Sequence, residues 1–488
     1  MSVSTLKKHF SRFLNGLCVV LAAASIAQAA DAKYVFLLIG DGMAMTQRSA
    51  AEIYQANRES AKGTPSVTHL AMNSLPAQGM STTYAADSYI PDSASAGTAI
   101  ATGNKTRDGM IAMDTTGAVP FKSIATLAHE KGMKVGIVSS VSIEHATPAV
   151  FYANEPSRKN YYEISLQIPR SNFDYFAGGG FLKPNGKKGD QKSIYDVLKD
   201  SGYTVTTTKA AFDALKAGSD TKVVSVNPVL DASQALPYDL DEKDAAQGIS
   251  LADFTAKGIE LLDNPNGFFM MVEGGKIDWT CHANDALASI RDTLAFDDAV
   301  KVALDFYKKH PEETLVIVTA DHETGGLTIG FAGTQYTTNF NVLSSQKMSY
   351  DVFDQTIAQW RKQQLPFEEA MKTVTECFGL STDPKAGVLA LADYEIAELK
   401  AAYAESMKEA DQRTDAKKAE YYLQFGGYEP FSISVTQTLN RHAGIGWTTY
   451  AHTGVPVPVS AIGFGHEAFN GYYDDCDIFT KMRTAMGL

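Results

Sequence analysis

The chain has 488 residues, and 43 Lys and Arg against 56 Asp and Glu give it a formal net charge of −13. Hydrophobic residues make up 44% and charged residues 20%, which is typical of globular proteins and excludes disordered, collagen-like and multi-span membrane chains. The acidic balance disfavours a protein that binds nucleic-acid backbones, because such proteins present a basic face. A small phosphorylated substrate stays open, since a local cluster of cations overrides the global sign.

The first 29 residues have the pattern of a secretory signal peptide. Basic residues at positions 7, 8 and 12 precede an apolar run over Phe13–Ala24, and Ala27-Gln28-Ala29 then supplies a small-x-small cleavage site. The alternative, an uncleaved membrane anchor, is disfavoured because this run is short for a bilayer span. Cleavage near Ala29 would leave 459 residues, with 40 basic against 56 acidic side chains and a net charge of −16. We therefore expect a periplasmic or secreted protein whose mature chain has no membrane span.

Cysteine is sparse after this segment. Cys281, Cys377 and Cys476 remain, and an odd number allows at most one disulfide and one free thiol. Three separate buried thiols are the alternative, and in neither case does the fold depend on a disulfide framework.

Apolar runs along the mature chain predict buried strands, with helical periodicity between them. The strand candidates are Tyr34–Ile39, Lys134–Val138, Phe268–Val272, Thr314–Val318 and Val457–Ile462. Phe121–Lys131 and Leu251–Leu262 have the spacing of helices that cover a sheet. Strands that alternate with helices indicate a mostly parallel sheet covered on both faces, so we predict a three-layer α/β/α sandwich.

Residues 331–446 differ in character from the rest of the chain. They are polar, rich in Gln, Lys, Glu and Tyr, and largely helical by pattern, most clearly over Tyr394–Asp411. We interpret them as a large insertion into a catalytic domain formed by residues 30–330 and 447–488. Surface elaboration, subunit contact and covering of the site are the three roles open to it.

Polar and ionisable residues follow the carboxyl ends of the strand candidates. Asp41 follows the first, Thr147 lies beyond the second, Glu273 ends the third, and Asp321-His322 follows the fourth. In open α/β sheets the ligand site lies outside those strand ends. We therefore expect these side chains to meet at one edge of the sheet.

Acidic and imidazole side chains in this set have the chemistry of zinc ligands. Asp278 and His282 are four residues apart, so on a helix they share one face. Oxygen and imidazole together suit Zn²⁺. Alone, this would be an ordinary surface pair, but Asp321-His322 forms a second such pair and His452 is a third candidate.

The segment Pro91–Ala99 predicts a short helix of small residues. Asp92 or Ser93 can cap its start and Gly103 can end it. One interpretation is a plain core helix; the other places the Ser93 hydroxyl at a helix N-terminus that favours phosphate. Serine is a poor nucleophile and needs an activator. No catalytic histidine is evident beside Ser93, which makes a metal the expected activator.

These segments together resemble the alkaline phosphatase family. The matching segments, in the family's order, are Ile39-Gly-Asp41-Gly-Met43, Pro91-Asp-Ser93-Ala, His145-Ala-Thr147-Pro148, Ser157-Arg158-Lys159, Gly178-Gly-Gly180, Val272-Glu273 through His282, Thr319-Ala-Asp321-His322 and His452-Thr-Gly454. They span nearly the whole mature chain apart from residues 331–446.

The resemblance implies a role for each matching residue. Ser93 would be the nucleophile that becomes phosphoserine, and Arg158 would hold two phosphate oxygens with its planar fork. Two Zn²⁺ and one Mg²⁺ are implied. Their ligands would be Asp278, His282 and His452 for the first zinc, Asp41, Asp321 and His322 for the second, and Asp41, Thr147 and Glu273 for the magnesium. A pair of metals of this kind serves the attacking and leaving oxygens of a phosphoryl transfer.

Four further residues stand beside this set. His145 and Trp279 occupy positions where some bacterial members carry an acidic residue and a lysine, so the third metal's identity and affinity stay open. His145 would either ligate that metal or hydrogen-bond through water, and Asp92 and Trp279 would support the ligands from behind. Cys281 is next to His282, but on a helix it points about 100° away, which favours a packed thiol over a zinc ligand.

The resemblance implies a broad phosphomonoesterase, because recognition is confined to the phosphoryl group. A phosphodiesterase or nucleotide pyrophosphatase commonly uses threonine and lacks the pair Thr147 and Glu273. No cysteine begins the Cys-x-Pro-x-Arg stretch of a sulfatase, and no Gly-x4-Gly-Lys-Ser/Thr loop of a kinase occurs. A non-catalytic zinc-binding or phosphate-binding protein is the alternative of another class. Dimers are usual in such families, so a homodimer is expected. The expected substrates are small phosphorylated molecules, and the expected product is inorganic phosphate.

Overall fold

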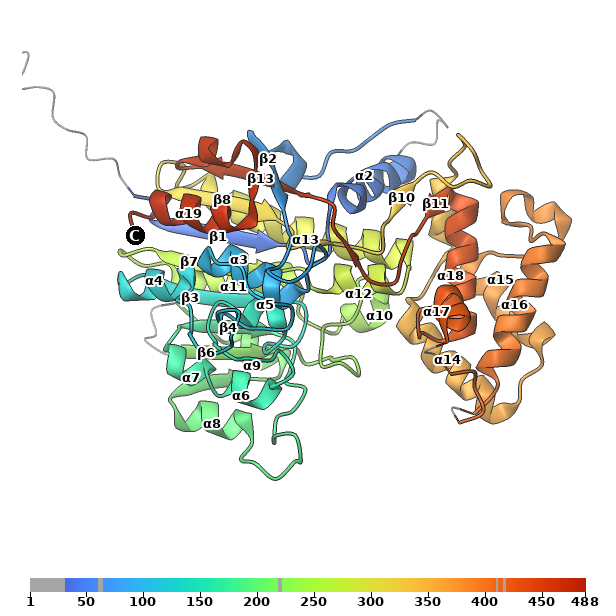
Figure 1. Cartoon of the computed structure of the whole chain (residues 1–488), viewed down its shortest axis with the longest axis horizontal. Coiled ribbons are helices and arrows are strands. Elements are labelled where there is room, and N and C mark those ends of the chain that lie inside the picture. Colours follow the sequence, from blue (N-terminus) through green and yellow to red (C-terminus); the bar gives the residue numbers. More distant parts are fainter. Residues whose placement is uncertain (1–30, 60–64, 218–221, 410, 416–417) are drawn as a thin grey trace, which may run out of the picture.

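The computed structural model describes residues 31–59, 65–217, 222–409, 411–415 and 418–488. The predicted signal peptide therefore lies outside the described residues. The main body is built around a ten-stranded sheet with the order β14-β2-β13-β8-β1-β7-β3-β4-β6-β5 (Figure 1). Its strands are β1 (Tyr34–Ile39), β2 (Ala77–Thr82), β3 (Lys134–Ser139), β4 (Tyr175–Gly178), β5 (Tyr203–Thr206), β6 (Lys222–Val226), β7 (Phe268–Glu273), β8 (Thr314–Thr319), β13 (Val457–Gly463) and β14 (Gly471–Asp474).

The sheet is almost entirely parallel. Within the described chain, β13 is antiparallel to both of its neighbours, β2 and β8, and the other pairings of this sheet are parallel. The central strands β8, β1, β7 and β3 start in register, with Tyr34 opposite both Phe268 and Thr314. Their carboxyl ends consequently finish at the same level of the sheet.

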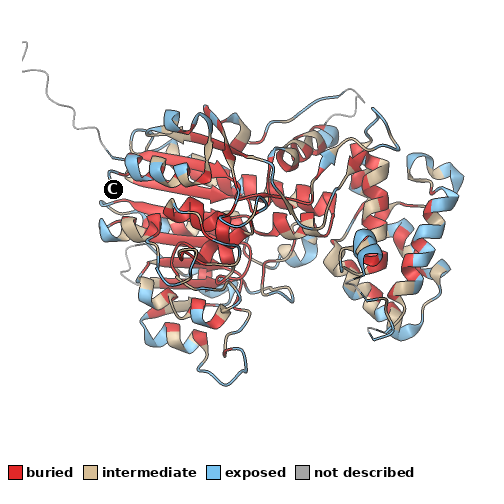
Figure 2. Cartoon of the chain, viewed as in Figure 1, coloured by how far each residue is buried: buried red, intermediate tan, exposed pale blue. Residues whose placement is uncertain are grey.

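Each face of the sheet packs against its own hydrophobic core. Phe36 of β1 belongs to one core, whereas its neighbours Val35 and Leu37 belong to the other, as the two-residue period of a strand requires. The central strands β1, β7 and β8 are buried along their whole length, while the helices expose their outer sides (Figure 2). Because both faces are covered, the central strands are continuously apolar, which is why the sequence predicts them so well.

Helices cover both faces and so complete the predicted α/β sandwich. One face packs against α2 (Met45–Glu59), α9 (Lys209–Asp213), α11 (Leu251–Leu262) and α13 (Ala286–Tyr307). The other packs against α3 (Ser93–Thr102), α4 (Ile124–Glu130), α5 (Ala146–Ala149), α6 (Tyr161–Ser165), α7 (Ile168–Ser171), α8 (Ile194–Asp200) and α19 (Asp475–Ala485). Shorter elements of the main body are η1 (Met72–Ser74), α10 (Glu242–Ala245), α12 (Lys276–His282), β9 (Glu323–Thr324), β10 (Thr328–Ile329), β11 (Ile445–Gly446), β12 (His452–Thr453) and η4 (His466–Phe469).

Residues 331–446 form a separate group of helices beside the end of the sheet, at the right of Figure 1. Its elements are η2 (Phe340–Ser345), α14 (Tyr350–Gln363), α15 (Phe367–Phe378), η3 (Pro384–Leu389), α16 (Asp393–Ser406), α17 (Ala419–Phe425) and α18 (Pro430–Ala443). The short ladder of β10 and β11 joins the two ends of this group, with Thr328 opposite Gly446. We keep the name "insertion" for residues 331–446.

The predicted elements agree closely with the observed ones. All five predicted strands are present within one residue of their predicted ends, and the helix predicted at Leu251–Leu262 is α11. The helix predicted from Phe121 starts at Ile124, because Ser123 caps it by accepting from the Thr126 amide at 3.1 Å. Strands β2, β4, β5, β6 and β14 were not predicted, since they are short and, toward the sheet edges, mix polar and apolar residues.

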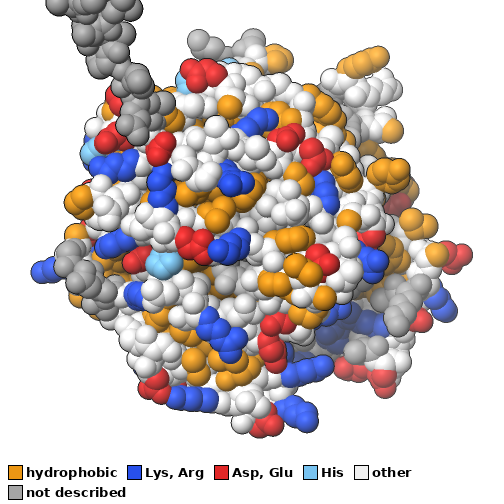
Figure 3. Space-filling model, turned by 60° about the vertical axis from the view of Figure 1, so that its left-hand side comes forward, with side chains coloured by type: hydrophobic (Ala, Val, Ile, Leu, Met, Phe, Trp, Pro, Cys, Tyr) orange, Lys and Arg blue, Asp and Glu red, His pale blue; other side chains and the backbone are white. Residues whose placement is uncertain are grey.

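The remaining features of the fold are its surface charges, its helix lengths and its cysteines. On the face shown in Figure 3, Lys and Arg side chains are interspersed with Asp and Glu rather than gathered into a patch. No helix in the described ranges combines the length and apolar character needed to cross a bilayer. Cys281, Cys377 and Cys476 are all free thiols, which agrees with the alternative of three separate thiols.

Candidate metal and phosphate site

The candidate site lies at the carboxyl edge of the central strands. Asp41 follows β1, Glu273 is the last residue of β7, and Asp321-His322 follows β8. Gly42 makes the turn after β1 with φ +72°, and a Cβ there would lie 2.7 Å from Thr324 Oγ1. A glycine is thus required where the turn passes between two groups of candidate ligands.

The "deep triad" consists of Asp41, Asp321 and His322. Their side chains are completely buried. His322 Nε2 lies 3.3 Å from Asp41 Oδ1 and 3.3 Å from Asp321 Oδ2. The three potential ligand atoms lie within 4.8 Å of one another.

The "outer triad" consists of Asp278, His282 and His452. Asp278 and His282 are on α12, as the four-residue spacing predicts, and Asp278 Oδ1 lies 3.4 Å from His282 Nε2 and 3.5 Å from His452 Nε2. His452 arrives from the far end of the chain on β12, which pairs with β9 and so places it opposite Thr324. The rings of His322 and His452 stack at 3.6 Å between centroids, so the two triads adjoin.

Backbone carbonyls orient the two outer imidazoles. His282 Nδ1 lies 2.6 Å from the Tyr450 carbonyl oxygen, and His452 Nδ1 lies 2.7 Å from the Pro91 carbonyl oxygen. A carbonyl only accepts, so each Nδ1 donates its hydrogen, and in a neutral ring Nε2 is left with its lone pair. The Nε2 lone pairs of His282 and His452 then both face Asp278. Metal-ligating histidines have this tautomer and orientation.

A third group lies beside the deep triad. Asp41, His145 and Glu273 offer ligand atoms within 4.8 Å of one another, and Thr147 Oγ1 donates to Asp41 Oδ2 at 3.3 Å. Ser139, at the end of β3, donates to Glu273 Oε2. Asp41 therefore belongs to two groups, and all the residues predicted for the third ion are brought together.

Burial and mutual repulsion dominate the electrostatics of the deep triad. Burial, reinforced by the charges of Asp321 and Asp278, raises the pKa of Asp41 well above its ordinary value. Burial also raises the pKa of Asp321 to about 7 and that of Glu273 to about 7. Burial lowers the pKa of His322 well below its ordinary value, so its imidazole is neutral.

The outer triad has the opposite character. Burial alone would lower the pKa of His282, but the charge and hydrogen bond of Asp278 outweigh burial and raise it to about 9. His282 and His452 in turn lower the pKa of Asp278 well below its ordinary value despite its burial. This triad thus supplies its own positive partner, whereas the deep triad does not.

Ser93 sits at the first turn of α3, next to the deep triad. Asp92 is the N-cap and accepts from the Ser95 amide at 2.9 Å, and Gly103 ends the helix in the left-handed conformation, as predicted. Ser93 Oγ lies 3.2 Å from His322 Nε2, a residue of the deep triad whose contact with Ser93 is not evident from the local sequence. The two residues are 229 positions apart in sequence, so only the fold brings them together.

Arg158 lies next to the nucleophile candidate. Its Nη1 donates to Asp92 Oδ2 at 2.8 Å, and its Nη2 lies 3.4 Å from His145 Nε2. Burial, aided by the Arg158 charge, lowers the pKa of His145 to about 3, so the ring is neutral. The guanidinium is thereby fixed by the residue that precedes Ser93.

The structure adds residues that the sequence did not indicate. The carbonyls of Tyr450 and Pro91 orient the imidazoles of His282 and His452. A backbone acceptor cannot be predicted from a pattern of side chains. Gln437 of α18 donates to Tyr450 Oη at 2.8 Å and to Asn284 Oδ1 at 3.1 Å, so the insertion supports the segment that carries His452. The hydrogen-bond pattern of this network could not be read from spacing.

Trp279 and Cys281 are not part of the three groups of candidate ligand atoms. Trp279 packs edge-on against His145, with ring centroids 5.7 Å apart. Cys281 is buried, and its thiol lies 3.2 Å from Ser289 Oγ, so it is a packed thiol as expected. Burial raises the pKa of Cys281, which disfavours a thiolate.

The residues present fit divalent cations. Asp41 Oδ1, Asp321 Oδ2 and Glu273 Oε1 are buried with no hydrogen-bond partner in the described structure. Buried carboxylate oxygens need a compensating charge, and the donor set of carboxylate and imidazole suits zinc, while carboxylate with hydroxyl suits magnesium. Both outer histidines already present Nε2 to Asp278.

The wide parallel sheet and the clustered carboxylates and imidazoles at its edge define an α/β enzyme with grouped metal-binding side chains. The sequence profile of the family described as "Alkaline phosphatase" matches residues 32–488, and the chain belongs to this family. It is therefore a phosphatase, a hydrolase of phosphate monoesters from a metal-dependent family.

Individual relatives agree with this assignment. Alkaline phosphatase 4 of Bacillus subtilis is 32% identical over 477 residues, which cover 95% of this chain and 91% of that protein. The structure of a cold-active alkaline phosphatase from a psychrophilic Shewanella is 28% identical, with a TM-score of 0.75 and coverage of 93% and 99%. A variant of the alkaline phosphatase of the Antarctic bacterium TAB5, with one histidine replaced by aspartate and Mg bound in its M3 site, is 26% identical, with a TM-score of 0.62 and coverage of 94% and 99%.

Proposed function

We propose that the protein hydrolyses phosphate monoesters through a phosphoserine at Ser93, with two Zn²⁺ and one Mg²⁺. One observation carries the proposal: Ser93 Oγ lies 3.2 Å from His322 Nε2, the imidazole that the buried carboxylates Asp41 and Asp321 share. A serine hydroxyl needs an activator, and this arrangement places it beside the deep triad, whose buried carboxylates require a cation.

The three groups assign ligands to the ions. The outer triad would hold one zinc, the deep triad the second, and Asp41, Thr147 and Glu273 the magnesium. The magnesium bound by the TAB5 variant supports a third site of this kind. His145 Nδ1 is buried without a partner among the described residues, and its ligand atom lies near Asp41 and Glu273, which favours direct ligation over a water-mediated contact. When bound, these ions supply Lewis-acid stabilisation of the attacking and leaving oxygens.

The chain's own residues supply the nucleophile and the phosphate grip. Ser93 Oγ attacks phosphorus in line while the ester oxygen leaves, and water later releases phosphate from the serine. The first turn of α3 presents free amides toward an anion at Ser93. Arg158, oriented by Asp92, offers its fork to two phosphate oxygens.

Recognition through the phosphoryl group leaves the ester's organic part little constrained, so we propose broad leaving-group tolerance. Serine at position 93, together with Thr147 and Glu273, favours monoesters over diesters. The insertion also supports the outer triad, because Gln437 donates to Tyr450, whose carbonyl orients His282. This support is a fourth role, beside surface elaboration, subunit contact and covering of the site. We also propose secretion after signal cleavage near Ala29, and a homodimer, which light scattering of the mature chain would test.

The proposal is tested with p-nitrophenyl phosphate at alkaline pH. Hydrolysis should exceed that of bis(p-nitrophenyl) phosphate, stop with chelator and return when Zn²⁺ and Mg²⁺ are added together. Ser93→Ala should lower kcat by about 10³-fold or more while metal content stays unchanged. Ser95→Ala, whose hydroxyl on the same helix bonds Asp108 at 2.8 Å, is the matched control and should retain most activity. Full activity in Ser93→Ala would remove the covalent route, and metal retention without turnover in the unmodified protein would indicate a non-catalytic binding protein.

A further inference from the structure

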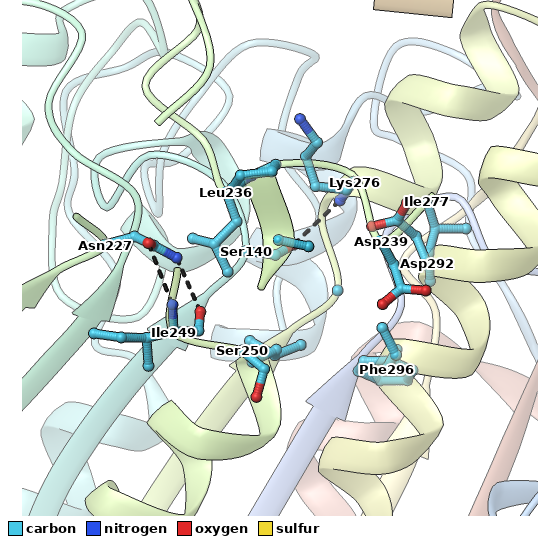
Figure 4. A pocket seen from close by; sticks show the side chains of 15 residues that line it. Ser140, Asn227, Leu236, Asp239, Ile249, Ser250, Lys276, Ile277, Asp292 and Phe296 are labelled. Atoms are coloured by element: carbon cyan, nitrogen blue, oxygen red, sulfur yellow. Dashed lines mark hydrogen bonds between the residues drawn. The ribbon is translucent and has the colours of Figure 1, made fainter. Parts of the chain in front are cut away.

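A second cavity lies behind the candidate site, between α13 and the loops that follow β6 and β7 (Figure 4). Its volume is about 70 Å³. One water needs about 10–15 Å³ by this measure, so the cavity has room for roughly five non-hydrogen atoms. Most of its wall is apolar, formed by Leu236, Pro237, Ile249, Leu251, Ile277 and Phe296.

One carboxyl oxygen in this apolar space lacks a hydrogen-bond partner among the described residues. The Asp292 carboxyl projects from α13 between Ile277 and Phe296 (Figure 4). Asp292 is only 8% exposed, and its Oδ2 has no hydrogen-bond partner in the described structure. Burial raises the pKa of Asp292 well above its ordinary value. A buried carboxyl in an apolar cavity is costly unless something neutralises or hydrogen-bonds it.

The neighbouring charges do not supply that partner. The Lys276 ammonium is directed away from the cavity (Figure 4), where it pairs with Asp231 and lies 3.5 Å from the centre of the Tyr238 ring. Arg291 donates to Asp239 at 2.7 Å and is thereby engaged. The charge of Asp239 raises the pKa of Asp292 and that of Lys276 lowers it, but neither side chain provides a partner for Asp292 Oδ2.

The other polar groups of the wall are already occupied. Ser140 Oγ accepts from the Lys276 amide at 3.2 Å. Asn227 donates to the Ile249 carbonyl at 2.9 Å and accepts from the Val229 amide at 3.1 Å. A bare metal ion needs several free oxygens, whereas an alkylammonium needs one carboxylate and apolar contact, and Asp292 Oδ2 is the one buried side-chain oxygen of the described wall without a hydrogen-bond partner.

We propose that this cavity binds a short primary alkylammonium of about five non-hydrogen atoms, with its nitrogen at Asp292 Oδ2 and its carbon chain against Leu251 and Phe296. Exposed Ser250 and half-buried Asp239 form the rim, so the ligand enters from the loop side. Gly274 and Lys276 of the wall lie between Glu273 and Asp278, and the site is thus adjacent to the metal groups while sharing none of their ligand residues. The proposal does not depend on the phosphoserine mechanism.

The probe is n-butylammonium chloride, titrated calorimetrically into the metal-loaded protein at neutral pH against matched NaCl. We expect one bound butylammonium per chain, and 1-butanol, its neutral isostere, should bind at least tenfold more weakly. Asp292→Asn keeps the side-chain shape but cannot form the carboxylate that an ammonium would pair with, so it should fold and lose about tenfold or more of the affinity. Asp298→Asn, an exposed acid on the same helix, is the charge-matched control and should bind normally.

A second variant separates shape from charge. Ala295→Leu fills the cavity and leaves Asp292 in place, so it should also abolish binding. Equal binding of 1-butanol, displacement of butylammonium by NaCl at equal concentration, or the same titration curve for Asp292→Asn would each overturn the proposal.

Discussion

The deep and outer triads adjoin at one edge of the sheet, yet they hold their charges differently. The deep triad has two carboxylates and one imidazole, all completely buried, and the charges of Arg158 and His452 offset burial of the two carboxylates only in part. The outer triad has one carboxylate and two imidazoles, and the His282 side chain is 26% exposed. His282 and Asp278 therefore stabilise each other without an ion, whereas the deep carboxylates repel one another.

The deep triad therefore depends on a cation to hold its carboxylates in the charged form, whereas the outer triad does not. Without metal, Asp321 keeps its proton until about neutral pH, because burial raises its pKa to about 7, and His282 of the outer triad keeps its proton until about pH 9, its raised pKa. Metal binding must displace these protons, so it is linked to pH at both sites but in different ranges. We expect the outer ion to exchange more readily, since its ligands are nearer to solvent.

The largest expected effect comes from Asp41→Asn. Asp41 belongs to the deep triad and to the third group, so the variant should lose two ions per chain and about 10³-fold or more in kcat. Metal analysis of the purified protein and p-nitrophenyl phosphate kinetics check this. Asp278→Asn, the matched outer variant, should lose one ion. Three retained ions in Asp41→Asn would contradict the shared ligand.

The pH dependence of stability separates the triads next. In the metal-free protein, the Asp321 carboxyl has a pKa of about 7, above the value of about 3.9 in the unfolded chain. A group with a raised folded pKa contributes stability below its unfolded pKa, and this is lost as the pH rises through about 7. Chelated protein should thus become less stable between pH 4 and 8, by on the order of a few kcal/mol.

Thermal unfolding at several pH values measures this loss. Other buried carboxyls contribute to the slope, so Asp321→Asn is the comparison: its metal-free form should lose less stability over the same range. Identical slopes for the two proteins would show that the deep triad is not the source. Added Zn²⁺ should restore stability most strongly at the alkaline end.

The smallest expected effect reports on the outer triad alone. Gln437→Ala removes the hydrogen bonds to Tyr450 and Asn284 and loosens the segment whose carbonyl orients His282. Supporting residues of metal sites are worth about 10–100-fold in affinity, and this more remote one should cost about tenfold for one zinc. Competition with a chelator measures it, and the second zinc should be unaffected. Exposed Gln424 provides the control, since Tyr450 bonds only its backbone carbonyl.

The sequence predicts the central sheet and the clustering of the candidate ligands well, for definite physical reasons. β1, β7 and β8 are buried on both faces, so their apolar runs are continuous, and parallel strands place Asp41, Glu273 and Asp321 at one edge. The edge strands β5 and β14 are partly exposed, so their alternation is weak and they were missed. The backbone acceptors of His282 and His452, and the contact of His322 with Ser93, depend on long-range packing that no local pattern encodes.

The central claim is that Ser93, activated at the deep triad, carries the phosphoryl group. The most direct measurement quenches the metal-loaded enzyme with acid during turnover of a phosphomonoester and maps the modified peptide by mass spectrometry. The account predicts one phosphate per chain on Ser93, absent from Ser93→Ala and from chelated protein. Turnover with an unmodified Ser93 peptide, or phosphate on another residue, would contradict it.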